Sequence, residues 1–144
     1  MLGRCHALFP SGGLLADHFF PSLRKAGLIK EHDQYFEKSW SIYSRLTKEY
    51  PNSERLHNGS AWMAARAVRH LSEAEEHAKK ALALNPDQSA YLDTMAEVQF
   101  AKRDRKAAVK WSAQAVNFDP PLSASGVMIR HQYERFLKEP FPEN

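Results

Sequence analysis

Residues Glu73 to Pro86 read Glu-Ala-Glu-Glu-His-Ala-Lys-Lys-Ala-Leu-Ala-Leu-Asn-Pro, and 34 residues further on, Ala107 to Pro120 read Ala-Ala-Val-Lys-Trp-Ser-Ala-Gln-Ala-Val-Asn-Phe-Asp-Pro. Both segments carry small residues four and then three positions apart. Residues at this spacing share one face of a helix, where a second helix can approach closely. The repeat therefore predicts two equivalent helices, each ended by its proline. The small residues are Ala74, Ala78 and Ala81 in the first segment and Ala108, Ser112 and Ala115 in the second.

This period and these residues resemble the second helix of a tetratricopeptide repeat (TPR), and in particular the C-terminal repeats of bacterial TPR proteins. The stretch from Tyr91 to Phe100 has the large-x-x-large-small opening of the family's first helix. Residues 58–65 depart from the pattern, because Trp62 stands where the family usually has a small residue. The resemblance implies an all-α fold, an antiparallel helix-pair solenoid of about three TPR-like units with a C-terminal capping helix.

A third and weaker unit lies upstream of the first two. Pro51 follows Ser39, Tyr43 and Leu46, which have the spacing of the three alanines before Pro86. We expect the first helix of this unit to contain the pair Ala26-Gly27, again a small pair after a large residue. Three units are about the minimum for a stable solenoid, because each unit contacts only its neighbours.

These patterns predict the division of the chain. We expect an irregular segment over 1–15, a helical repeat domain over 16–138 and a tail over 139–144. Within the domain the units are predicted at about 20–53, 55–88 and 89–122, with the capping helix at 123–138. The apolar residues of that last helix are Val127, Ile129, Tyr133, Phe136 and Leu137.

Composition and charge restrict the class of protein. The chain has 144 residues, a net charge of +3 and the single cysteine Cys5, which cannot form an internal disulfide. No apolar run is long enough to span a bilayer, and His6 and Pro10 interrupt what would have to be the apolar core of a signal peptide. We therefore expect a soluble, cytoplasmic protein without a membrane span. The small positive charge disfavours nucleic acid as a partner.

The sequence gives little support to catalysis or metal binding. It has no Gly-x-Ser-x-Gly elbow and no glycine-rich phosphate loop. His70 with Glu73 and His131 with Glu134 have a helical i,i+3 spacing, but neither pair has a third ligand nearby in the sequence. We predict that the protein is not an enzyme and has no cofactor and no metal. The histidines are interpreted as solvated surface residues: His6, His18, His32, His57, His70, His77 and His131.

The basic run Lys102-Arg103-Asp104-Arg105-Lys106 falls at the predicted turn between two helices, with Trp111 just beyond it. Such a cluster can hold phosphates or an acidic protein tail. Turns in helical repeats also tolerate charge freely, and Trp111 belongs to the helix with the packing pattern. We therefore interpret the run as a solvated turn and most of the aromatic residues as core. Trp62 and Phe100 stay open as ligand contacts, because they lie on the predicted inner helices.

In TPR arrays the first helix of each pair lines a concave groove that holds a partner segment, which the resemblance implies here too. The groove is expected to be basic at one end and acidic at the other. The acidic end would repel a carboxylate, so the family's clamp for a C-terminal carboxylate is disfavoured. A partner of mixed charge suits it better. The predicted partner-binding residues are Arg24, Lys25, His32, Met63, Arg66, Asp93, Glu97 and Phe100.

Two functions follow from these features. The first is a protein–protein interaction scaffold that binds a peptide or helix of a partner in the concave groove, without catalysis. The alternative is a structural spacer or self-assembly unit, the C-terminal end of a longer repeat array, with possible self-association through the exposed face. The fold alone does not decide between them.

Overall fold

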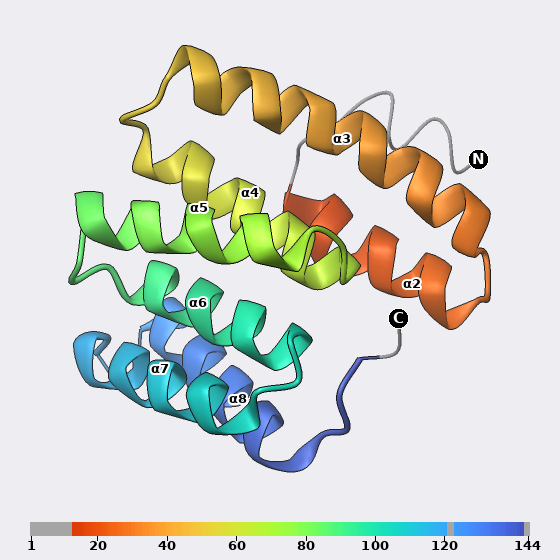
Figure 1. The fold of residues 1–144 in the computed structure, drawn as a ribbon. Coiled ribbons are helices and arrows are strands. Elements are labelled where there is room, and N and C mark those ends of the chain that lie inside the picture. The colour runs from red at the N-terminus through yellow and green to blue at the C-terminus, as the bar shows by residue number, and fades with distance from the viewer. Residues whose placement is uncertain (1–12, 121–122, 143–144) are drawn as a thin grey trace.

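The computed structural model describes residues 13–120 and 123–142, which form helices joined by short turns (Figure 1). Residues 1–12, including Cys5 and His6, lie outside the described residues. The prediction of an all-α chain is confirmed for the described part. The elements are η1 (Leu15–Phe19), α2 (Phe20–Lys25), α3 (Ile29–Glu49), α4 (Glu54–Ala67), α5 (Leu71–Leu84), α6 (Ser89–Ala101), α7 (Arg105–Phe118) and α8 (Ala124–Lys138).

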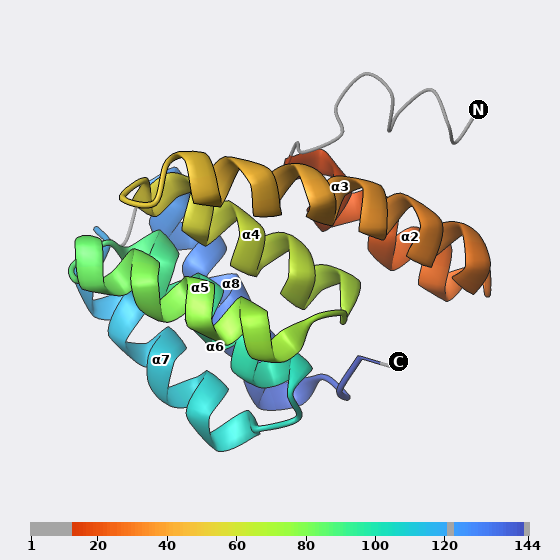
Figure 2. The ribbon, with the colours of Figure 1, turned by 45° about the horizontal axis from the view of Figure 1, so that its top comes forward.

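The helices pack in two groups. Helix α4 packs on η1, α2 and α6, and α6 packs on α8; we call η1, α2, α4, α6 and α8 the inner helices. Helices α3, α5 and α7 each pack on an inner helix next to them in the chain and form the outer helices. The ribbon shows α4 to α7 as successive antiparallel helices, with α8 beside α6 and α7 (Figures 1 and 2). None of the helices formed by residues 13–120 and 123–142 is both long and apolar enough to cross a membrane.

The repeated small residues form the buried faces of two outer helices. Helix α7 begins at Arg105, 34 residues after α5 begins at Leu71, and each helix has 14 residues. In both helices the buried residues are the ones that the sequence repeat singles out: Ala74, Ala78 and Ala81 in α5, and Ala108, Ser112 and Ala115 in α7. The prediction of two equivalent helices that approach their neighbours through small residues is therefore confirmed.

Helix α6 is the centre of the molecule. It packs on α4, α5, α7 and α8, and every residue from Tyr91 to Ala101 is buried. A helix that is buried on all sides usually carries few polar groups. Here Asp93, Thr94, Glu97 and Gln99 are buried as well, so the surroundings of these polar side chains need an explanation.

The first helix pair differs from the sequence prediction. Helix α2 ends at Lys25, and Gly27 has a left-handed backbone (φ 71°) in an exposed turn before the long helix α3. The prediction that Ala26-Gly27 lies inside the first helix is therefore wrong. Glycine adopts positive φ without a steric penalty and so ends the helix early.

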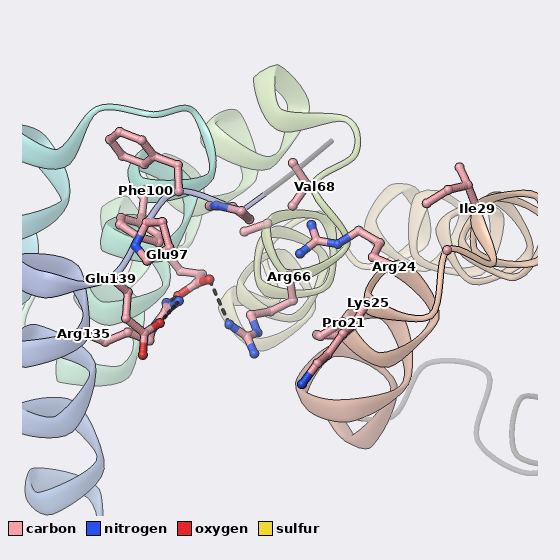
Figure 3. A pocket seen from close by; sticks show the side chains of 15 residues that line it. Pro21, Arg24, Lys25, Ile29, Arg66, Val68, Glu97, Phe100, Arg135 and Glu139 are labelled. Carbon is pink, nitrogen blue, oxygen red and sulfur yellow. Dashed lines mark hydrogen bonds and ion pairs between the residues drawn. The ribbon is translucent and has the colours of Figure 1, made fainter.

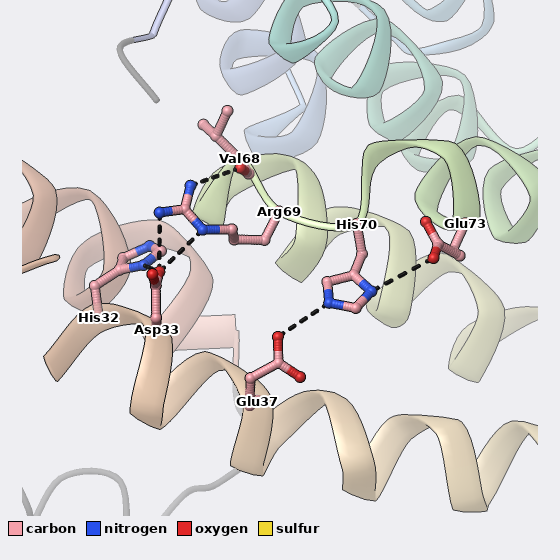
Figure 4. Close-up of polar contacts among 7 residues, drawn as sticks. All are labelled: His32, Asp33, Glu37, Val68, Arg69, His70 and Glu73. Carbon is pink, nitrogen blue, oxygen red and sulfur yellow. Dashed lines mark hydrogen bonds and ion pairs between the residues drawn. The ribbon is translucent and has the colours of Figure 1, made fainter. Parts of the chain in front are cut away.

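The turn from α4 to α5 is held against α3 by polar contacts (Figure 4). Val68 and His70 have left-handed backbones (φ 56° and 49°), a costly conformation for side chains with a β-carbon. Arg69 between them donates from Nε to Asp33 Oδ1 at 2.9 Å. His70 bonds to Glu37 at 3.0 Å and its ring lies 4.9 Å from that of Trp40. These contacts fix where α4 ends and thereby position its groove residues.

Candidate functional site: the inner-helix groove

A groove runs along the inner helices, with α4 and α6 at its base and η1–α2 and α8 as its walls. Two cavities lie along it. We call them the basic cavity, lined among others by Arg24, Lys25 and Arg135, and the acidic cavity, lined among others by Asp17, Trp62 and Asp93. Arg66 lines both cavities, so they are neighbours along α4.

The basic cavity has a volume of about 830 Å³. Figure 3 shows Arg24 and Lys25 on α2, Arg66 on α4 and Arg135 on α8 around the space between these helices. The carboxylates in the lining are Glu97 and Glu139. Four cations therefore face two anions, and this end of the groove carries a positive charge.

Glu97 is at the centre of an ion-pair network between three inner helices. Its side chain is 3% exposed, and Oε1 accepts from Arg66 Nη1 at 3.1 Å. Arg135 of α8 donates to the other carboxylate oxygen (Figure 3). Hydrogen bonds from guanidinium groups to a carboxylate are stronger than those between neutral groups. Glu97 therefore contributes to holding α4, α6 and α8 together and is not an open acidic site.

The chain's own C-terminal segment lies against the basic cavity, whose lining includes residues 139–142. The Phe141 ring packs 5.3 Å from the Phe100 ring and lies 4.9 Å from the Arg105 guanidinium, centroid to carbon. Arg105 also donates hydrogen bonds to the backbone carbonyls of Phe136 and Glu139 at the end of α8. Residues 139–142, the described part of the predicted tail, thus pack at one end of the groove.

The acidic cavity has a volume of about 740 Å³ and combines apolar walls with two carboxylates. Its apolar residues include Trp62 of α4 and Met128 of α8, and Met128 is 69% exposed. The indole Nε1 of Trp62 donates to Asp17 Oδ1 at 2.8 Å, which joins α4 to η1 across the cavity. The guanidinium carbon of Arg66, which lines both cavities, lies 5.7 Å from the Trp62 ring centroid.

Two buried acceptor atoms in the acidic cavity's lining residues lack hydrogen bonds. Oδ1 of Asp93 and Oδ1 of Asn58 are shielded from solvent and have no partner among the described residues. Burial, with a further contribution from the charge of Glu97, raises the pKa of Asp93 to about 7. Buried acceptors are usually satisfied, and leaving one unpaired costs about 1–3 kcal/mol. The lining of this cavity therefore leaves two buried acceptors unsatisfied.

The structure brings six of the eight predicted groove residues to the cavity linings: Arg24, Lys25, Arg66, Glu97 and Phe100 at the basic cavity, and Asp93, with Arg66 again, at the acidic cavity. Phe100, however, is only 1% exposed, because Phe136 and Phe141 cover its ring. A partner would contact the aromatic cluster at Phe141 and not at Phe100 itself.

The prediction that His32 and Met63 line the groove is wrong. Both are buried in the core, with 0% and 3% exposure. The groove stripe on α4 runs through Asn58, Trp62 and Arg66 at four-residue spacing, and this spacing places Met63 on a different side of the helix. Trp62, the residue that departs from the family pattern, is the one that faces the groove.

The histidines also differ from the prediction of solvated surface residues, which is wrong for His32 and His57. Both are buried, and His57 Nδ1 lies 2.8 Å from His77 Nδ1. Burial lowers the pKa of His77 and, despite a hydrogen bond to Asp33, that of His32. Among the described residues no group of three His, Cys, Asp or Glu side chains could hold a metal ion.

The basic run at residues 102–106 is partly used inside the molecule. Lys102 pairs with Glu75 of α5, and hydrogen bonds from Lys102 and Lys79 lower the pKa of Glu75 to about 2. Arg105 is bound to the end of α8, as described above. Arg103 and Lys106 are exposed, as expected of a turn.

Sequence reasoning missed two features of the groove. Arg135 was not predicted to bind Glu97, because it lies 38 residues away on a helix interpreted only as a cap. Asn58 gave no signal of its own, although its four-residue spacing from Trp62 and Arg66 could have indicated a shared face. A comparison with protein-family models and with curated proteins finds no match to this chain.

Proposed function

We propose that this chain is a TPR-like protein-interaction scaffold that binds a peptide or helix of a partner protein in the inner-helix groove. The 34-residue spacing of α5 and α7, with the same small buried residues in each, supports the tetratricopeptide-type architecture. The two neighbouring cavities along α4 support a role in binding an elongated segment. Its basic and acidic cavities favour a segment that carries both signs of charge.

The observation that carries the proposal is the packing of residues 139–142 at one end of the groove. An extended Pro-Phe-Pro segment lies there, with its aromatic ring on Phe100 and under Arg105. The groove surface is therefore chemically suited to an extended peptide with an apolar anchor. The acidic cavity beside it also offers apolar contacts, because Met128 is exposed and Trp62 is partly exposed. Within residues 13–120 and 123–142, no comparable extended segment fills this cavity.

The proposal is tested by selecting peptides from a displayed random library on the immobilised full chain. We expect binders whose affinity falls at least about tenfold with Met128→Asp, because the carboxylate would enter an apolar contact. Leu137→Asp is the matched control, since Leu137 is an exposed apolar residue of the same helix outside both cavities.

Far-UV circular dichroism of the two variants checks that the helices are retained. Binders that lose no affinity with Met128→Asp would contradict the proposal, as would a library that yields no binder. Sedimentation of the wild type at several concentrations addresses the spacer and self-assembly alternative. A self-associating wild type that becomes monomeric with Met128→Asp would favour that alternative.

A further inference from the structure

Two acceptors of the acidic cavity's lining have no hydrogen-bond partner among the described residues. Asp93 is 8% exposed, and neither its Oδ1 nor Oδ1 of Asn58 has a hydrogen-bond partner among the described residues. The two residues project from different helices, α6 and α4, to the same cavity. Nε of Arg66, which also lines the cavity, is a buried donor that has no partner among the described residues either, so three polar atoms of this lining are left unpaired.

The nearby arginines do not bond to either acceptor. Arg66 and Arg135 lower the pKa of Asp93 through their charge, but both donate to Glu97, and Arg135 also donates to Gln132. Asp17 accepts from the indole of Trp62 and adds a second carboxylate to the cavity. His18 and His131 also line it and are exposed. The cavity's lining therefore has two acceptors that no described side chain satisfies.

The remaining walls suit an aliphatic chain. Trp62, Val127, Met128 and Ile129 border the same cavity, and Val127 and Met128 are more than half exposed. A lysine side chain has a four-carbon stem that can cover such a surface and an ammonium with three donors at its end. An arginine head is larger and planar, and it prefers a bidentate carboxylate.

We infer that the acidic cavity is a recognition site for a lysine side chain of the partner segment, whose ammonium binds Asp93 and Asn58 while its stem packs on Trp62 and Met128. This inference rests on the proposed function and specifies its ligand chemistry. The basic cavity beside it then binds the acidic or aromatic part of the same segment. Retaining an unpaired buried carboxylate is costly to the free protein, and a bound ammonium would offset that cost.

The test compares matched peptides from the library selection described above. For a selected groove-binding peptide, the lysine is replaced by norleucine, which keeps the stem and removes the ammonium, and by arginine. We expect norleucine to weaken binding about 10- to 100-fold, the range for a charge-assisted hydrogen bond, and arginine to weaken it less. Affinity is measured by isothermal titration with the full chain.

Asp93→Asn isolates the protein side of the contact. It should weaken the lysine peptide about tenfold or more and leave the norleucine peptide within about twofold. Asp87→Asn, at an exposed carboxylate outside both cavities, is the control and should change neither. Because the ionised carboxylate is required, lysine-peptide affinity should rise between about pH 6 and 8 for the wild type but not for Asp93→Asn.

The outcomes separate the inference from the proposed function. Groove binders that lack a lysine or arginine, or that tolerate norleucine within twofold, would overturn the lysine site and leave the scaffold function in place. Equal losses for both peptides with Asp93→Asn would also overturn it, because they would indicate a structural role for Asp93. A library without any groove binder would overturn both.

Discussion

The substitution Asp93→Asn should stabilise the free protein, and increasingly so as the pH rises. Burial and the nearby Glu97 raise the pKa of the Asp93 carboxyl from 3.8 to about 7 in the folded chain. Between these values the folded chain holds a proton that the unfolded chain has released. The contribution of Asp93 to stability is therefore complete below the unfolded pKa and is lost as the pH rises through the folded pKa.

The size of the effect follows from the shift. One pKa unit corresponds to about 1.4 kcal/mol, so a shift of about three units costs the wild type roughly 4 kcal/mol once the carboxyl is ionised in both states. An asparagine of the same shape does not titrate. The difference in unfolding free energy between variant and wild type should thus grow by about 2–3 kcal/mol from pH 5 to pH 8.

Urea unfolding of both proteins, followed by far-UV circular dichroism at the two pH values, measures this difference. The comparison cancels the titration of the buried histidines, which both proteins share. Asp87→Asn, at an exposed carboxyl, should show a difference that changes by less than about 0.5 kcal/mol. The reasoning is refuted if the Asp93→Asn difference is as independent of pH as that of the control.

Three further predictions concern the Glu97 ion pairs and the starts of α7 and α8. Glu97→Ala should cost about 3–5 kcal/mol of unfolding free energy, because it leaves two arginines without their shared buried partner, and a loss below about 1 kcal/mol would contradict the network. Arg103→Gly should raise the thermal midpoint, because glycine removes the steric cost of about 1 kcal/mol that Arg103 has in its left-handed backbone conformation (φ 67°). Lys106→Gly, inside a helix, is the control and should lower the thermal midpoint. Equal shifts for the two variants would contradict the assigned turn. Gly126→Ala should destabilise by about 1–3 kcal/mol in urea titrations, since its β-carbon would overlap the backbone carbonyl of Pro120, and a neutral result would show that α8 begins differently.

The sequence is most informative about the outer helices. The close approach of these helices depends on residue size at fixed positions. The small residues of α5 and α7 therefore predict both the helix and its buried face. The same pattern is weaker in α3, where Ser39 is buried but Tyr43 and Leu46 remain half-exposed. The length of α3 and the early end of α2 depend on a left-handed Gly27, whose role as a turn residue a small-residue pattern does not reveal.

The groove was harder to predict because it depends on contacts between distant helices. The sequence prediction places Met63 and Arg66 of this helix in the groove, whereas α4 presents the i,i+4 stripe of Asn58, Trp62 and Arg66. Helix α8 and the segment after it cover Phe100 and neutralise Glu97, and nothing in the sequence of α6 indicates this. The charge separation along the groove could be predicted, because Arg24 and Asp93 lie on different units of the chain.

The proposal that the inner-helix groove binds a partner segment is tested most directly by nuclear magnetic resonance. The full chain, labelled with nitrogen-15, is titrated with a peptide selected on it, and the amide and indole shifts are followed residue by residue. We predict that the largest changes fall on groove residues, above all the Trp62 indole, Met128 and His131. Changes concentrated on the outer helices α5 and α7, with the Trp62 indole unmoved, would contradict the proposed binding groove.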